Sequence, residues 1–235
     1  TPPPNAGRAN IEICEHVPQN VAAGDNSRIA RLSDAAARLL NDYDLVIGTD
    51  ADEFLVVDPR TGKSLAEYLS SIKIKGSVSA LGMDVGQHRE NEKPIDASQP
   101  FLSQRHYALV STRYTKSSVI SEPLRWGAGF HRVRGRNFRI DPNLYLFHFG
   151  CVDLAMCMAK FSDQDRMASG WEKHMRKRLR TIEMVSGRKV HKGEGWLKFA
   201  RRLQRAVRLP YAWNKPAMFG WRLVVEIPER FSTTV

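Results

Sequence analysis

The sequence has little cysteine, and its cysteines form no recognisable pair. The three residues, Cys14, Cys151 and Cys157, give neither a CxxC motif nor an even set. This pattern argues against a disulfide framework and against a zinc site, and it suits a reducing compartment. We therefore expect three isolated thiols in a cytoplasmic protein.

Long apolar runs are also absent. No stretch of about 18 uninterrupted apolar residues occurs, so the sequence predicts no transmembrane helix. The first ten residues, TPPPNAGRAN, contain neither a Met nor the basic-then-apolar pattern of a signal peptide. We interpret residues 1–10 as a flexible arm and the chain as starting internally. With 235 residues, 42% of them hydrophobic, the chain fits one large domain, alone or with a small appendage.

Negative charge is scarce in one segment. Residues Gly170 to Arg208 contain 13 Lys and Arg but only 3 Asp and Glu, whereas the remainder has 23 against 22. The net charge of +11 is thus carried almost entirely by this segment. Such a block indicates contact with an anionic partner such as phosphate groups, lipid headgroups or nucleic acid.

The order of predicted elements indicates an α/β fold. A strand at 11–17, a helix at 27–41 and a buried strand at 45–49 follow one another, as in a parallel sheet. Ser64 and Glu67 predict a capping box at the next helix. Further strands are expected at 78–85, 105–110, 118–120, 130–133 and 144–149, with a polar loop at 86–100. We expect one domain over 11–152, and a helical, basic C-terminal region over 153–235 with a loop at 186–195.

An acidic cluster lies between two apolar runs in YDLVIGTDADEFLVVDP, residues 43–59. Asp50 and Asp52 are two apart, so in an extended segment both carboxylates face one side. The carboxyl end of such a strand is where open α/β sheets bind ligands, and oxygen ligands suit Mg²⁺ or Mn²⁺. The alternative is a solvated acidic turn, although the flanking apolar runs disfavour it. An EF-hand is excluded, because Leu55 and Thr61 stand where it needs Gly and Glu.

The segment YDLVIGTDADEFLVV resembles the D-x-D-E-F segment of family 2-related glycosyltransferases with the GT-A fold. The resemblance covers roughly residues 11–185 and continues in order through an Asn-x-Arg near a helix start (Asn26, Arg28), YTKSSVI (114–120), GFH (129–131) and LYLFHFG (144–150). It implies a GT-A-like mixed central sheet with a helical C-terminal appendage. Because only 49 residues precede Asp50, we expect the first β-α unit of that fold to be missing from this sequence.

The resemblance further implies transfer from a UDP- or GDP-sugar, with Asp50 and Asp52 holding Mn²⁺ or Mg²⁺ and the metal holding the donor diphosphate. His148 is the first candidate for a third metal ligand and His131 the second; either is otherwise a core histidine. Glu53 is expected to orient the loop or to contact donor or acceptor.

The remaining candidates supply cations and a base. Arg28 and Lys116 are expected to bind the donor, or else lie on the surface. An inverting transferase needs a carboxylate base, for which Asp84 is preferred over Glu122; either carboxylate is otherwise a solvated or helix-capping group.

The basic tail suggests a second kind of contact. Trp196, Phe199, Ala200, Leu203 and Val207 form one helical stripe with basic residues on the other sides, which is typical of a helix lying on an anionic membrane. The alternative is a helix docked on the body, and no nucleic-acid recognition motif occurs.

The sequence therefore predicts a metal-dependent, inverting glycosyltransferase that modifies a cell-surface polysaccharide or glycolipid at the inner face of the membrane, with 196–221 as the membrane contact. The alternative is a non-catalytic basic module that binds membrane or nucleic acid.

Overall fold

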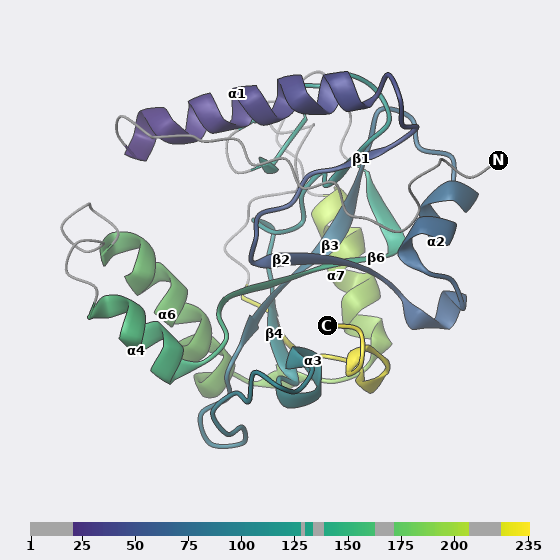
Figure 1. Ribbon diagram of the computed structural model, residues 1–235. Helices are drawn as coiled ribbons and strands as arrows, with labels where there is room; N and C mark the ends of the chain where they lie inside the picture. Colours follow the sequence, from purple (N-terminus) through teal and green to yellow (C-terminus); the bar gives the residue numbers. More distant parts are fainter. Residues whose placement is uncertain (1–20, 128–129, 134–138, 163–171, 207–221) are drawn as a thin grey trace.

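The computed structural model describes residues 21–127, 130–133, 139–162, 172–206 and 222–235 (Figure 1). Within these residues the protein is a mixed α/β structure with an open, mostly antiparallel sheet of eight strands and six α-helices. The predicted arm at 1–10 and the predicted strand at 11–17 lie outside the described residues. No described helix is long and apolar enough to cross a membrane.

Two long strands form the centre of the sheet. β3 (Ser77–Gly86) is buried along its whole length and pairs in parallel with β6 (Ile140–Cys151). β2 (Glu53–Val57) pairs antiparallel with β6. The remaining strands are β1 (Val46–Ile47), β4 (Tyr107–Val110), β5 (Val119–Ile120), β7 (Val190–His191) and β8 (Val224–Glu226). Together with β3 they are hydrogen-bonded in the order β1-β5-β3-β4-β8-β7.

Two strand predictions and the prediction of a helical C-terminal region need correction. The segment 45–49 yields only the two-residue β1, which pairs antiparallel with β5 and leaves Ile47 44% exposed, so it is not a parallel strand buried on both faces. The segment 130–133 provides only an isolated bridge between Trp126 and Val133. The C-terminal region is not purely helical, because β8 pairs with β4 and β7 pairs with β8.

The helices lie around this sheet (Figure 1). α1 (Val21–Leu39) packs Ile29 and Ala36 against Trp126 and Phe130. It overlaps the helix predicted at 27–41 but begins earlier, so Arg28 lies inside the helix and not near its start. α4 (Leu154–Phe161) and α6 (Glu172–Gly187) pack together at one side. α2 (Leu65–Ser71) begins with the predicted capping box, and α3 (Phe101–Gln104) is a single turn.

α7 (Glu194–Ala206) is a docked helix. It turns Leu197 and Ala200 into the main core and also buries Arg201 and Gln204, while Phe199 stays 45% exposed. The inward face is thus rotated from the predicted apolar stripe. Contact with the sheet decides which face of α7 is buried. The inward face can include Arg201, because its guanidinium lies over the Tyr145 ring, 4.4 Å from the ring centroid.

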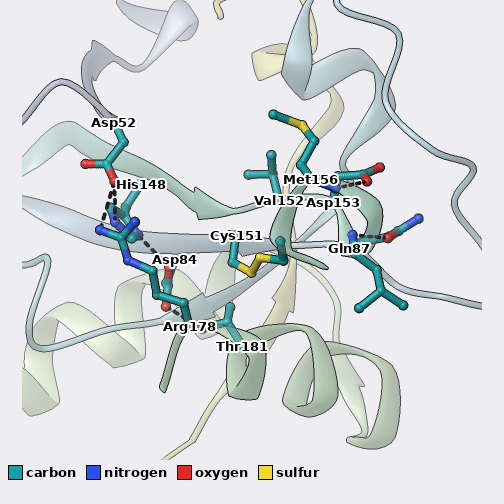
Figure 2. The surroundings of a disulfide bond; sticks show 12 residues. Asp52, Asp84, Gln87, His148, Cys151, Val152, Asp153, Met156, Arg178 and Thr181 are labelled. Carbon is teal, nitrogen blue, oxygen red and sulfur yellow. Dashed lines mark hydrogen bonds and ion pairs between the residues drawn. A yellow bond between two sulfur atoms is a disulfide. The ribbon is translucent and has the colours of Figure 1, made fainter. Parts of the chain in front are cut away.

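The prediction of isolated cysteines is wrong for two of the three. Cys151 at the end of β6 and Cys157 in α4 form a disulfide, with Cα atoms 5.7 Å apart (Figure 2). Asp153 caps α4 by accepting from the Met156 N–H, so the chain reverses between the two cysteines. Cysteine usage therefore no longer supports a reducing compartment. Cys14 lies outside the described residues.

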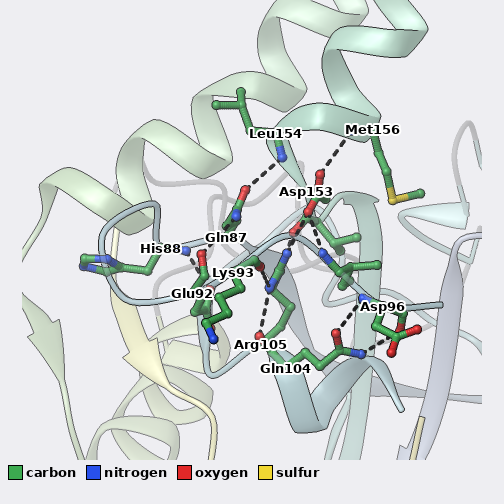
Figure 3. Close-up of polar contacts among 12 residues, drawn as sticks. Gln87, His88, Glu92, Lys93, Asp96, Gln104, Arg105, Asp153, Leu154 and Met156 are labelled. Carbon is green, nitrogen blue, oxygen red and sulfur yellow. Dashed lines mark hydrogen bonds and ion pairs between the residues drawn. The ribbon is translucent and has the colours of Figure 1, made fainter. Parts of the chain in front are cut away.

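The predicted polar loop at 86–100 is tied to the end of β6 (Figure 3). The fully buried Arg105 donates to the carbonyls of Val152 and Lys93, and it pairs with Asp153 at 3.0 Å. The Asp153 carboxylate also accepts from the Ile95 N–H. Because a buried charge is tolerated only when it is paired and hydrogen-bonded, this network fixes where β6 ends and α4 begins.

Candidate functional site

The register of three adjacent strands gathers the first part of the site. His148 on β6 lies opposite Glu53 on β2 and beside Asp84 on β3. All three side chains are buried, with residue exposures of 2%, 5% and 8% respectively. The sheet thus holds two carboxylates and an imidazole side by side, although their positions are far apart in the sequence.

His148 connects two carboxylates. Its Nδ1 lies 2.7 Å from Asp84 Oδ1 and its Nε2 lies 3.4 Å from Asp52 Oδ2 (Figure 2). The Tyr114 ring stacks on the imidazole at a centroid distance of 3.7 Å. Burial alone would lower the pKa of His148, but the hydrogen bonds with Asp52 and Asp84 outweigh it and raise the pKa. The arrangement therefore favours an imidazolium between two acidic side chains.

α6 supplies two further contacts. Arg178 Nη2 donates to Asp52 Oδ2 at 3.1 Å, and Thr181 Oγ1 donates to Asp84 Oδ2 at 2.8 Å (Figure 2). The hydrogen bond from His148, and then the charges of His148 and Arg178, lower the pKa of Asp52. Each Asp84 oxygen already accepts a hydrogen bond, so the buried Asp84 is held in place. It contacts one nitrogen of His148, whose other nitrogen faces the more exposed Asp52.

Asp50 belongs to a second group of charges. Its carboxylate accepts from Arg28 Nη1 at 2.8 Å and from Lys116 Nζ at 3.3 Å. Lys116 is 1% exposed and also pairs with Glu53 at 2.7 Å, while Glu53 accepts from the Asp50 N–H at 3.0 Å. Burial raises the pKa of Asp50, but Lys116 and Arg28 outweigh that effect and lower it. Glu53 thus ties the Asp50 turn to Lys116.

His131 and Glu122 take different places. His131 Nδ1 lies 2.6 Å from the Arg113 carbonyl, and burial followed by the charge of Lys116 lowers its pKa to about 4. It is therefore neutral near pH 7, with Nδ1–H donating and Nε2 able to accept. Glu122 follows β5 at the end away from the acidic turn, since β1 and β5 are antiparallel and the Gly48 N–H donates to Ser118.

Two glycines permit this close packing. A Cβ at Gly150 would come within 2.7 Å of His148 Nε2, and a Cβ at Gly82 within 2.7 Å of the Ser111 carbonyl oxygen. The bare Gly82 lets the turn after β4 lie against β3, which brings Tyr114 over His148. Any larger residue at Gly150 would displace the imidazole.

The site as a whole has balanced formal charge. Counting His148 as charged, it holds four carboxylates and four cationic groups: Asp50, Asp52, Glu53 and Asp84 with Arg28, Lys116, Arg178 and His148. Sequence reasoning missed three of its residues, Tyr114, Arg178 and Thr181. The basic composition of the segment containing Arg178 was the only signal for that residue. Tyr114 opens the YTKSSVI segment of the resemblance but was assigned no role, and Thr181 carried no signal.

The accessible carboxylates of the site are Asp50 and Asp52. Their side chains are 29% and 33% exposed, whereas Glu53 and Lys116 are each 1% exposed. Among the described residues, no three His, Cys, Asp or Glu side chains are gathered so as to hold a metal ion. A metal ion held by Asp50 and Asp52 would have to displace their cationic side-chain partners. Comparisons with protein-family models, with curated proteins and with solved structures found no match to this chain.

Proposed function

We propose that this protein is a metal-dependent, GT-A-like glycosyltransferase that moves a sugar from a UDP- or GDP-sugar to an acceptor hydroxyl on a polysaccharide or glycolipid. One observation carries the proposal: Asp50 and Asp52 are partly exposed at the start of β2, and each carboxylate has only cationic side-chain partners in the described contacts. Such partners can be exchanged for a divalent cation and a phosphate-bearing donor.

The donor chemistry of the site fits Mn²⁺ or Mg²⁺. Asp50 and Asp52 would hold the ion, with the neutral His131, or His148 after it loses its Nε2 proton, as a further ligand. Each histidine already places Nδ1 against an acceptor, Asp84 for His148 and the Arg113 carbonyl for His131. Metal-binding histidines in proteins characteristically have such a partner. When bound, the ion would neutralise charge on the leaving diphosphate.

The cationic side chains would bind the donor phosphates. Arg28 and Arg178 now neutralise the exposed carboxylates; once a cation takes over that role, they are available to oxygen atoms of a diphosphate, whereas the buried Lys116 remains paired with Glu53. Because the resting site is neutral, a cation alone or an anion alone leaves uncompensated charge near a buried cluster. We therefore expect metal and nucleotide to bind together more tightly than either binds alone.

The buried residues position this site. We propose that Asp84 orients His148, since both Asp84 oxygens accept hydrogen bonds and the residue is 8% exposed. This placement favours a supporting role over the general-base role predicted for Asp84. Glu53 orients the Asp50 turn and neutralises Lys116.

Calorimetric titration of UDP and GDP, with and without Mn²⁺, tests the proposal. We expect binding only with metal in the wild type, and its loss in Asp52→Ala. Asp34→Ala is the control, because Asp34 pairs with Arg125 on the exposed surface. Unchanged nucleotide affinity of Asp52→Ala in the presence of metal would contradict the assignment.

Contact with an anionic membrane remains a separate proposal. In α7 the exposed residues include Phe199, Lys198 and Arg202, but the inward face is already docked. The predicted contact surface at 196–221 lies largely outside the described residues, as does Val207. The non-catalytic alternative predicts binding to anionic vesicles with steep salt dependence and no response to nucleotide.

A further inference from the structure

A basic hollow lies at the C-terminal end of α6, away from the candidate site. It has a volume of about 580 Å³, and its lining includes Arg188, Lys189, Arg222, His191 and Glu183. This volume is within the range of about 300–1,000 Å³ that is typical of small-molecule sites. Arg178 lies nine residues before the end of α6 at Gly187, which corresponds to about 14 Å along the helix. The hollow is therefore a second location.

The fold brings these cations together. β7 and β8 are parallel, with Val190 opposite Val224. Arg188 and Arg222 each stand two residues before those partners, so both precede the same end of the strand pair. Neighbouring strands lie about 4.8 Å apart, so two guanidinium groups start from adjacent backbones. Lys189 follows Arg188 at the entry to β7.

The positive charge of the hollow exceeds its negative charge, and its three cations have no ion-pair partner within the described residues. Arg188, Lys189 and Arg222 are exposed and form no ion pair with a described residue, whereas nearby Lys192 pairs with Glu226 at 3.1 Å. Arg188 and Lys189 follow the C-terminus of α6, where cations are favourable for the helix dipole. That explanation does not cover Arg222, which reaches the hollow from the start of β8.

We propose that this hollow binds a phosphate monoester. Three cations against one carboxylate, Glu183, leave two positive charges in the lining, which match a doubly ionised phosphate. Arginine donors arranged from two neighbouring strands suit phosphate oxygens, because guanidinium groups bind phosphate in a bidentate manner. The hollow shares no residue with the candidate active site, so this inference does not rest on the proposed transferase function.

NMR titration of the whole chain with inorganic phosphate tests the inference. We expect saturable shifts of the backbone amides from Gly187 to His191. The double variant Arg188→Glu/Arg222→Glu should weaken binding at this location by about tenfold or more, a change of about 1.4 kcal/mol. The matched control Lys198→Glu/Arg202→Glu makes the same charge change on exposed positions of α7 and should alter the affinity by less than about twofold, because those residues do not line the hollow.

Two further arms identify the source of the phosphate group. Glucose 6-phosphate represents a free sugar phosphate, and phosphatidic acid in phosphatidylcholine vesicles represents a lipid headgroup. A response to either one supports the site and assigns its source. Shifts absent from residues 187–191 in the wild type, or equal weakening in the two double variants, would overturn the proposal. The wild-type shifts decide the matter even where a variant fails to fold.

Discussion

The two ends of β2 show two different uses of the same chemistry. At its start, Asp50 and Asp52 are about one-third exposed and bind Lys, Arg and His partners at 2.8–3.4 Å. At its end, Asp58 is 1% exposed and accepts five hydrogen bonds from Arg60 and Arg230. Glu194 pairs with both arginines as well.

The two ends differ in how fully the carboxylate oxygens are occupied by hydrogen-bond donors. Asp58 has both oxygens enclosed by two guanidinium groups, so it offers no position to a ligand and joins β2 to η5 (Glu229–Phe231) near the C-terminus. Asp50 and Asp52 keep exposed surface and each contacts two separate cations. A closed network stabilises the fold, while an open one can exchange partners. Variants at the two ends of β2 should therefore affect different properties.

The largest loss of stability is expected at the closed end. Asp58→Ala removes the buried partner shared by two arginines and should cost about 2–3 kcal/mol of unfolding free energy, since five hydrogen bonds are lost and both arginines keep only Glu194 as a partner. Metal-dependent nucleotide binding should remain. Urea unfolding and calorimetry measure the two effects. Asp34→Ala should cost less than about 0.5 kcal/mol, and an equal loss in both variants would contradict the comparison.

Gly150→Ala should damage the open end. The new Cβ would press on the His148 ring, so we expect a cost of about 1–3 kcal/mol together with the loss of metal-dependent nucleotide binding. Gly195→Ala is the matched control, because no atom lies within 4 Å of a Cβ placed there. Unfolding curves and nucleotide titrations of both variants check the prediction. Normal nucleotide binding in Gly150→Ala would show that the position of His148 is unimportant.

Asp84→Asn should have a smaller effect on stability, about 1 kcal/mol, because the amide retains the shape and one acceptor oxygen. Metal-dependent nucleotide affinity should fall by about 10–100-fold, as is usual when the partner of a ligating histidine is lost. The pKa of His148 should also fall, since one of its two carboxylate partners is neutralised. NMR titration of the imidazole distinguishes this role from a purely structural one, which would leave that pKa unchanged.

The smallest effect is expected in how the free energy of unfolding depends on pH, which should differ between the two ends of β2. Urea unfolding of the metal-free wild type, compared with Asp58→Ala and with His148→Gln, measures the two contributions. Burial raises the pKa of Asp58, but hydrogen bonds from Arg60 and Arg230 leave it lowered. Its contribution is therefore complete above the ordinary value of 3.8 and is lost as the pH falls. The raised pKa of His148 acts oppositely: its contribution is complete below 6.5 and is lost as the pH rises. Parallel trends in the two comparisons would contradict this assignment of charges.

Several parts of this molecule could be predicted because they depend on neighbouring residues. Ser64 and Glu67 form the predicted capping box, and the apolar spacing after Ser27 corresponds to α1. The acidic turn between two apolar runs also identified the candidate site. The strands that failed were short: 45–49 begins with three apolar residues, and 130–133 has only Phe130 and Val133. In segments of this length periodicity does not specify the partner or the extent of burial.

The sequence by itself determined the turns, the caps and the placement of Asp50 and Asp52 beside a strand, since these depend on contacts within a few residues. Only the tertiary structure decided that Asp84 supports His148 from 64 positions away and that Arg178 reaches Asp52 across 126. It also decided the pairing of Cys151 with Cys157 and the entry of β7 and β8 into the sheet. Strand register and helix docking depend on burying the core of the whole sheet, and no single segment contains that information.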